Sequence, residues 1–374
     1  MSEEKAWKPL DLVKVSAEYL ASKQVPNARL DAELLLCDIM GLSRRVDLYA
    51  GFEREISGKE LSAYRELIRR RAAREPVSRI LGRREFMGLT FAVTPDVLSP
   101  RPETELLVET AIEFIRPKKA TLPPDETDQA EIAAIVPDET VLPEMEDQLA
   151  RLLDSYAEDA DDPEDESEKP PLAPAPRTVT AKPAVPARKQ RTETQQASSA
   201  RSSVRVVDLG TGSGCIAVSL AAMLPEAMVI AVDASPNALA VAKENAKKAG
   251  VAEQMEFRRG DWFAGCKQGE TFDLILSNPP YLVKEDPDIW PEVSLYDPPL
   301  SLYAGQDGLD CYRRIIPHLG DWLAPDGAVM LEVGAGQAGR VAEMLKNAGF
   351  LQVETIKDYG GVERVVKASS YAGV

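Results

Sequence analysis

From residue 204 onward, hydrophobic residues follow two alternating patterns. Short apolar runs predict buried strands, and longer segments with apolar residues at helical spacing predict helices. The strands are VRVVDL, MVIAVD, MEFRR, FDLILS, AVMLEV, FLQVETI and VERVVK, and the helices are CIAVSLAAML, PNALAVAKENAKKAG, LDCYRRIIPHLGDWL and GQAGRVAEMLKNAG. Such alternation predicts an α/β domain with a mainly parallel sheet covered on both faces. Only the last two strands are too close for an intervening helix, so we expect them to pair antiparallel.

The first part of the chain has a different pattern. Residues 1–78 predict a small helical domain, and residues 79–102 predict a β-hairpin linker that turns at Gly88. One helix of the first domain is LDAELLLCDIMGL, ended by Gly41, and another is KELSAYRELIRRRAAREP. A helix from Glu103 to Pro117 follows, so residues 103–116 and 204–374 are expected to form the α/β domain.

Residues 117–203 lack these patterns and predict a disordered insertion. They hold 12 of the 28 prolines, and the segment from Asp125 to Glu168 has 18 acidic residues and one basic residue. The whole chain has 61 acidic and 44 basic residues, so the net charge of −17 belongs to this segment alone. Such a composition cannot bury enough apolar surface to offset the entropy lost on ordering. Because the insertion precedes the first strand, we expect it to leave a site at the strand ends intact.

The rest of the chain is neutral, which argues against a protein that coats nucleic acid non-specifically. Its most basic cluster, near the end of the second long helix, predicts a solvated helix face, with a nucleic-acid or ribosome contact as the alternative. The cluster consists of Arg69, Arg70, Arg71 and Arg74.

Several absences in the sequence predict a cytoplasmic protein. No apolar run is long enough to span a membrane, and the first residues lack the apolar core of a secretory signal. The four cysteines are widely spaced, as expected for reduced thiols in the cytosol. With His318 as the single histidine, the sequence does not indicate a metal site.

A glycine-rich turn follows the first strand of the sheet, in the segment VVDLGTGSG at residues 206–214. Its glycines let the backbone approach a ligand where a Cβ would clash. The turn predicts a cofactor site at Gly210, Thr211, Gly212, Ser213 and Gly214. Alone it is a weak signal, because dinucleotides bind to related turns.

Two further strand ends make the cofactor prediction specific. Asp233 ends the next strand, where a carboxylate can accept hydrogen bonds from ribose hydroxyls; its alternative role is a turn or helix cap. Asp261 and Trp262 follow the third strand, where an acid can accept from an adenine amino group and an aromatic ring can pack on the base; core packing is the alternative for Trp262. This spacing and the G-x-G-x-G turn favour S-adenosylmethionine over NAD. Seven strands with a reversed terminal hairpin are the Rossmann-like layout of class I S-adenosylmethionine-dependent methyltransferases.

The fourth strand, FDLILS, runs directly into a catalytic motif, Asn278, Pro279, Pro280 and Tyr281. A planar amide or amino nitrogen is a poor nucleophile because its lone pair is delocalised. The Asn278 side-chain oxygen and the Pro279 carbonyl can accept its two N–H bonds, and Tyr281 can stack on the planar group. Catalysis would then rest on positioning and electrostatics, without a metal. A rigid proline turn without chemistry is the alternative, and the motif alone does not distinguish adenine from glutamine as substrate.

Outside residues 117–203, the chain resembles the release-factor glutamine N5-methyltransferases, the PrmC/HemK family. The resemblance rests on LDAELLLCDIMGLSR, EPVSRILGRREFMGLTFAV, SPRPETELLVE, DLGTGSGCIAVSLA, DASPNALAVAKENA, LSNPPYL and LYDPPLSLYAGQDGLDCYRRII. It implies that residues 210–214, Asp233, Trp262 and Asn278 bind S-adenosylmethionine and that residues 278–281 hold the glutamine of the Gly-Gly-Gln motif in peptide chain release factors. The helical domain would help to engage this protein substrate.

The same resemblance implies that Arg101 and Glu103, in the segment RPETE, lie near the site entrance and contact the substrate. Their alternative roles are local, at the start of a helix. The insertion at 117–203 departs from the family, in which this link is usually short, and the sequence identifies no partner for it.

Two other functions remain as alternatives. A DNA adenine N6-methyltransferase would need a target-recognition region and a basic groove, which the sequence does not supply clearly; we expect no direct DNA binding. A non-catalytic binding module on this fold is disfavoured by the intact glycine turn and by residues 278–281.

Overall fold

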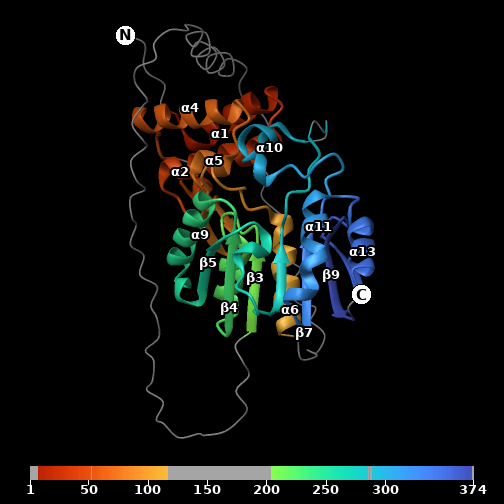
Figure 1. Cartoon of the computed structure of the whole chain (residues 1–374). Helices are drawn as coiled ribbons and strands as arrows, with labels where there is room; N and C mark the ends of the chain where they lie inside the picture. Colours follow the sequence, from red (N-terminus) through yellow and green to blue (C-terminus); the bar gives the residue numbers. More distant parts are fainter. Residues whose placement is uncertain (1–6, 52, 117–203, 285, 287–288, 373–374) are drawn as a thin grey trace, which may run out of the picture.

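The computed structural model describes residues 7–51, 53–116, 204–284, 286 and 289–372. Its centre is a seven-stranded sheet with the order β5-β4-β3-β6-β7-β9-β8 (Figure 1). The strands are β3 Val204–Leu209, β4 Ala227–Asp233, β5 Met255–Arg259, β6 Phe272–Ser277, β7 Leu323–Glu332, β8 Phe350–Lys357 and β9 Glu363–Tyr371. Only the pairs β7–β9 and β8–β9 are antiparallel, which confirms the predicted parallel sheet with a reversed terminal hairpin.

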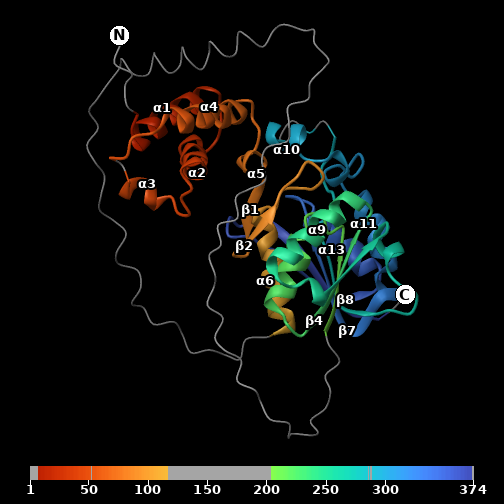
Figure 2. The same ribbon diagram turned by 90° about the vertical axis from the view of Figure 1, so that its left-hand side faces the viewer.

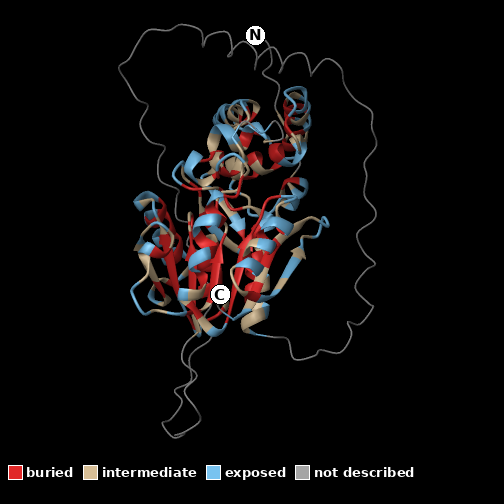
Figure 3. Ribbon diagram, turned by 45° about the vertical axis from the view of Figure 1, so that its right-hand side comes forward, coloured by how far each residue is buried: buried red, intermediate tan, exposed pale blue. Residues whose placement is uncertain are grey.

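Helices cover both faces of this sheet, whose central strands are coloured as buried (Figure 3). Buried apolar side chains form one core on each face of the sheet. One face carries α6 (Glu105–Ile115), α8 (Cys215–Met223) and α9 (Pro236–Ala249), and the other carries α11 (Asp310–Ile315), α12 (Leu319–Trp322) and α13 (Ala338–Asn347). Successive residues of β3 serve opposite layers: Val206 packs into the first and Val207 into the second. A central strand is therefore apolar throughout, because both of its faces are buried.

The N-terminal helices form a separate layer at one end of the sheet (Figure 2). They are α1 Pro9–Ser22, α2 Ala28–Met40, α3 Val46–Ala50, α4 Gly58–Ala72 and α5 Val77–Leu81. They share their own apolar core, which includes Leu12, Leu35 and Tyr64. Gly41 ends α2 with a φ of 67°, as predicted, since glycine adopts this conformation without a steric penalty.

The predicted hairpin is present as β1 (Arg83–Phe86) and β2 (Leu89–Ala92). Both residues of its two-residue turn, Met87 and Gly88, have positive φ, as a tight hairpin turn requires. The Ala92 N–H donates to Asn245 Oδ1 on α9 at 2.8 Å, which attaches the hairpin to the α/β domain.

Two predicted elements differ in the structure. Residues 79–81 are not extended but complete α5, which begins after Pro76 and ends at Gly82 in the left-handed conformation. The single helix expected over LDCYRRIIPHLGDWL is divided into α11, a 3₁₀ turn at Ile316–His318, and α12. Pro317 has no N–H to continue the α-helical hydrogen bonds, which explains the break.

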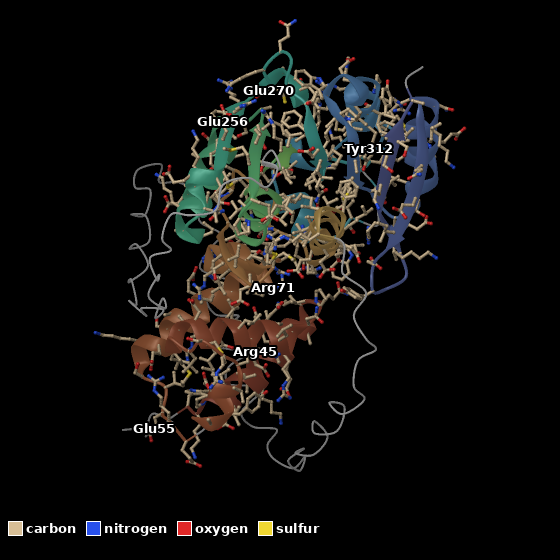
Figure 4. All side chains as sticks on the ribbon, turned by 90° about the horizontal axis from the view of Figure 1, so that it is seen from below. Arg45, Glu55, Arg71, Glu256, Glu270 and Tyr312 are labelled. Atoms are coloured by element: carbon tan, nitrogen blue, oxygen red, sulfur yellow. The ribbon has the colours of Figure 1, made fainter. Side chains whose placement is uncertain are left out.

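The prediction that the arginine cluster at the end of α4 forms a solvated face is wrong for Arg71 and Arg74, whereas Arg69 is exposed. Arg71 is only 4% exposed, and its Nε donates to Asp31 Oδ2 at 2.7 Å. Both of its Nη atoms lie 3.2 Å from Glu292 Oε1, and Arg74 Nη2 donates to Glu292 Oε2 at 2.9 Å. Because Glu292 lies in α10 (Pro291–Tyr296), after β6, these ion pairs join the helical domain to the α/β domain (Figure 4).

The predicted insertion, residues 117–203, lies outside the described residues. The residues that flank it lie at the amino-terminal edge of the sheet: Val204 begins β3, and Arg116 Nε donates to Glu226 Oε1, next to the start of β4, at 2.7 Å. The glycine turn follows the opposite end of β3. Within the described part of the chain, no helix is long and apolar enough to cross a membrane.

We predict that Arg71→Met destabilises the protein by about 3–5 kcal/mol, because it leaves the buried carboxylates of Asp31 and Glu292 without their main partner. Arg69→Ala is the control, since Arg69 pairs with Glu66 in solvent and such pairs contribute about 1 kcal/mol or less. Urea unfolding followed by circular dichroism measures both. Equal losses of unfolding free energy in the two variants would contradict a dominant role for the buried pair.

Candidate active site

The glycine turn closes the carboxyl end of β3 against β4. Gly210, Gly212 and Gly214 have φ values of 78°, 54° and 80°, which favour glycine. The N–H groups of Gly210 and Thr211 both donate to the Val232 carbonyl at 2.9 Å. A Cβ at Gly212 would meet no atom within 4 Å, whereas one at Gly214 would lie 3.0 Å from the Ala242 Cβ. Gly212 therefore borders open space, and Gly214 allows α8 and α9 to pack closely.

Asp233 faces the glycine turn from the end of β4. Its Oδ2 accepts from the Gly212 N–H and its Oδ1 from the Ser235 N–H, each at 2.8 Å. Ser235, not Asp233, caps α9 by accepting from the Ala238 N–H. Burial raises the pKa of Asp233, and these backbone N–H groups oppose the shift. Each carboxylate oxygen retains acceptor capacity, so the side chain can also accept from two hydroxyl groups.

The structure separates Trp262 from its neighbour Asp261. The Trp262 ring lies over the glycine turn, since a Cβ at Gly210 would be 3.4 Å from Trp262 Cζ3. Trp262 has a φ of 53°, an uncommon conformation for a non-glycine residue, and its Nε1 is buried without a hydrogen-bond partner in the described part of the chain. The exposed Asp261 carboxylate instead pairs with Arg314 of α11.

A pocket of about 700 Å³ lies beside the glycine turn rather than within it. Asp261, Trp262, Arg314 and His318 contribute to its walls, and neither the glycine turn nor residues 278–281 line it. Asp233 and the Trp262 ring thus both contact the glycine turn. The Asp261 carboxylate instead lies at the neighbouring pocket.

The motif at residues 278–281 continues β6 beside the glycine turn. Ser277 Oγ donates to the Leu209 carbonyl at 2.6 Å, so the ends of β6 and β3 are joined immediately before Asn278 and Gly210. Asn278 Nδ2 donates to Thr104 Oγ1 at 3.1 Å. This bond uses the amide nitrogen, and Asn278 Oδ1, at the end of β6, has no partner among the described residues and can accept a hydrogen bond.

Tyr281 is held from three sides. Its hydroxyl donates to Glu332 Oε1 at 3.4 Å, and its carbonyl accepts from Gln337 Nε2 at 2.9 Å. The next residue, Leu282, donates to the Leu302 carbonyl at 2.8 Å, which fixes the chain beyond the motif. Burial raises the pKa of Tyr281 well above its ordinary value, so the phenol remains neutral.

Two buried acidic residues, Asp208 and Glu332, lie next to the glycine turn and to Tyr281. The sequence interpretation singled out neither of them. Asp208 precedes the glycine turn and accepts from Thr211 Oγ1 at 2.6 Å; Glu332 ends β7 beside Tyr281. Burial raises the pKa of each carboxyl to about 7. An acidic residue at the end of an otherwise apolar strand, in VVDL and MLEV, was the available signal.

The RPETE segment lies beside the motif at residues 278–281 and contacts it through Thr104. Arg101 Nη2 donates to Asp297 Oδ2 at 2.7 Å, and Arg79 Nη2 donates to the other oxygen of that carboxylate at 2.8 Å. Glu103 is exposed at the sheet edge. Thr104, which was not predicted, is the residue that contacts Asn278. Whether Arg101 and Glu103 contact a substrate stays a prediction.

Comparison with known proteins shows which families this chain resembles. Residues 11–82 match the family described as PrmC N-terminal domain, and residues 194–293 match the methyltransferase small domain. The release factor glutamine methyltransferase of Geobacter sulfurreducens is 36% identical over 349 residues, covering 93% of this chain and 92% of the relative. That of Cereibacter sphaeroides is 33% identical, covering 96% and 97%. Among solved structures, TrmN from Thermus thermophilus is 26% identical, covers 46% of this chain and 45% of that one, and has a TM-score of 0.33.

We predict that Asp208→Asn alters how stability depends on pH. The folded protein keeps the proton on Asp208 up to about pH 7, whereas the unfolded chain releases it near its ordinary pKa of 3.8. The folded state therefore binds more protons between these values, and wild-type stability falls as pH rises through this range. Between pH 5 and pH 8, the variant should gain about 2–3 kcal/mol relative to wild type.

Urea unfolding at several pH values measures this difference. Glu332 titrates in both proteins and cancels from the comparison. Parallel stability curves for wild type and Asp208→Asn would show that Asp208 does not hold a proton in the fold.

Proposed function

The chain belongs to the family of release factor glutamine methyltransferases, and on that premise we propose that it methylates peptide chain release factors with S-adenosylmethionine as methyl donor. The acceptor is the side-chain amide nitrogen, N5, of the glutamine in their Gly-Gly-Gln motif. The observation that carries the proposal is the free Asn278 Oδ1, which lies at the end of β6 beside the glycine turn and whose orientation is set by the bond from Nδ2 to Thr104.

The residues around the glycine turn fit S-adenosylmethionine. Gly212 borders open space, Asp233 has acceptor capacity for the ribose hydroxyls, and the buried Trp262 Nε1 has no partner among the described residues. When bound, this cosubstrate supplies an electrophilic sulfonium methyl group. Within the described residues no group of three or more His, Cys, Asp or Glu side chains is arranged to hold a metal ion.

Residues 278–281 would activate the glutamine amide by position and hydrogen bonding. Asn278 Oδ1 and the Pro279 carbonyl accept the two N–H bonds of the substrate nitrogen, which draws electron density onto nitrogen and turns its lone pair toward the methyl carbon. The N–C bond would form as the S–C bond breaks and S-adenosylhomocysteine leaves, and the nitrogen would then lose one proton to solvent water. Tyr281, kept neutral by burial, adds an apolar ring without a competing charge.

The segment after the motif supports a protein substrate. Trp290, Leu295 and Leu300 are 56%, 69% and 90% exposed, and they lie between residues 278–281 and α11. Ion pairs from Arg71 and Arg74 to Glu292 fix this segment against the helical domain. Exposed apolar side chains in a fixed segment beside a site are typical of a surface that binds another protein.

We expect the protein to transfer label from methyl-labelled S-adenosylmethionine to a release factor and not to duplex DNA. Mass spectrometry of the digested release factor should place the added methyl group on the Gly-Gly-Gln glutamine. Label on DNA, or on neither substrate, would rule the proposal out.

Asn278→Ala should lower kcat at least a hundredfold, because it removes one of the two acceptors for the substrate amide. Calorimetry should still detect cosubstrate binding. Asn347→Ala is the matched control: Asn347 ends α13 just before β8, at the amino-terminal edge of the sheet opposite residues 278–281, and its loss should leave kcat unchanged. Full turnover by Asn278→Ala would refute the assigned role.

Asp233→Asn should weaken S-adenosylmethionine binding about ten- to a hundredfold, since hydrogen bonds to a charged acceptor contribute about 1.5–3 kcal/mol. Asp261→Asn provides the comparison, because the Asp261 carboxylate pairs with Arg314 and should matter less. Titration calorimetry measures both dissociation constants. An equal loss in Asp261→Asn would show that this carboxylate leaves Arg314 to bind the adenine amino group.

A further inference from the structure

Thr104 is the N-cap residue of α6, which begins at Glu105, but its side chain does not cap that helix. A threonine at this position ordinarily accepts a hydrogen bond from a backbone N–H of the first turn, and here the side chain makes no such bond. Thr104 is 1% exposed, so its hydroxyl is withdrawn from solvent as well. The described hydrogen bond of this hydroxyl is the one from Asn278 Nδ2, at 3.1 Å. The Thr104 hydroxyl therefore contacts the loop that carries Asn278 and not the backbone of α6.

Glu332 approaches the same loop from β7. Ser277 of β6 pairs in register with Leu331 of β7, so Asn278 and Glu332 follow as neighbours at the ends of adjacent parallel strands. The Tyr281 hydroxyl donates to Glu332 Oε1, and the Tyr312 hydroxyl donates to the Glu332 carbonyl at 2.7 Å. The second carboxylate oxygen, Oε2, is buried and has no hydrogen-bond partner in the described part of the chain. The Thr104 hydroxyl lies near this carboxylate and lowers its pKa.

We propose that Thr104 and Glu332 are positioning residues that hold the Asn278 amide with its nitrogen inward and its oxygen toward the substrate. The proposal rests on the function proposed above, in which Asn278 Oδ1 accepts from the glutamine amide. Neither residue touches the reacting atoms. They act through Asn278, and Glu332 also acts through Tyr281.

The direction of the hydrogen bonds explains why a carboxylate is needed. An ionised carboxylate accepts only, so it draws the hydroxyl proton of Thr104 toward itself. The Thr104 oxygen then presents a lone pair to Asn278 and can bind its Nδ2 but not its Oδ1. Rotating the amide by 180° would place two acceptors against each other, at a cost of about 1–3 kcal/mol for an unpaired buried group. Ionised Glu332 thus selects the orientation that catalysis requires.

Protonation of Glu332 removes this selection, because a carboxylic acid can donate to Thr104 and reverse the chain of hydrogen bonds. Among the groups that act on Glu332, the negative charge of Glu103 raises its pKa, whereas Arg364 and the hydroxyls of Thr104 and Tyr281 lower it. Burial outweighs them and raises the pKa of Glu332 to about 7. The orientation should therefore be secured above pH 7 and lost as pH falls below it.

The first test compares Thr104→Val, which keeps the shape but removes the hydroxyl, with Thr104→Ser, which restores it. With release factor as substrate, Thr104→Val should lower kcat about ten- to a hundredfold with little change in KM, and Thr104→Ser should recover most of the loss. Thr110→Val is the matched control in the helix that follows Thr104, because among the described residues the Thr110 hydroxyl bonds to the Leu106 carbonyl within α6. A wild-type kcat in Thr104→Val, or a loss as large in Thr110→Val, would overturn the proposal.

The second test follows pH. Wild-type kcat should rise with pH through about 7, and Glu332→Gln, which cannot ionise, should have a low kcat without this rise. Survival of the rise in Glu332→Gln would remove Glu332 from the proposed role.

A third measurement separates this proposal from the proposed function. The side-chain NH₂ resonances of ¹⁵N-labelled Asn278, identified by their absence in Asn278→Ala, can be observed without any release factor. At pH 8 the hydrogen bonded to Thr104 should exchange more slowly in wild type than in Thr104→Val, and this protection relative to the variant should be smaller when both proteins are measured at pH 6. If wild type shows this behaviour but labels no release factor, the positioning stands and the substrate assignment falls. Identical exchange in the two proteins would overturn the positioning itself.

Discussion

Buried ion pairs near the carboxyl ends of the parallel strands determine how the helical domain packs against the α/β domain. Asp297 is 4% exposed and receives Arg79 from α5 and Arg101 from the segment before α6. Glu292, in α10, receives Arg71 and Arg74 from the helical domain. A buried carboxylate without its cation is costly, so each pair fixes the position of the chains that supply it.

The active site inherits its rigidity from these pairs and from the sheet. The loop that carries Asn278 begins at the paired ends of β6 and β3, and it is followed by the segment that the arginines hold. Around the loop, buried groups remain neutral or are hydrogen bonded: the Tyr281 phenol keeps its proton, and Asn278 uses its nitrogen on Thr104. Methyl transfer to an amide needs such fixed dipoles rather than a strong acid or base, because the reaction is controlled by the direction of one nitrogen lone pair.

Sequence patterns were most reliable where a local rule fixes the structure. Apolar runs identified all seven strands, and Gly41 and Gly88 marked an actual helix end and hairpin turn. The same approach failed for residues 79–81, where the helix signals of Pro76 and Gly82 prevail, and for the helix that Pro317 interrupts. It also misassigned Arg71, because a basic residue on a helix has the same local pattern whether its carboxylate partners lie in solvent or in another domain.

The sequence by itself determined the parallel sheet, the glycine turn and the motif at residues 278–281, since strand periodicity and the chemistry of glycine, proline and asparagine are local properties. Only the tertiary structure decided which groups meet these residues. Thr104 reaches Asn278 across 174 positions of sequence, and Glu332 reaches Tyr281 across 51. It likewise turned Asp261 toward Arg314 and Trp262 toward Gly210. Such contacts depend on strand order, which no local pattern encodes. They also depend on burial, which removes water as a competing hydrogen-bond partner.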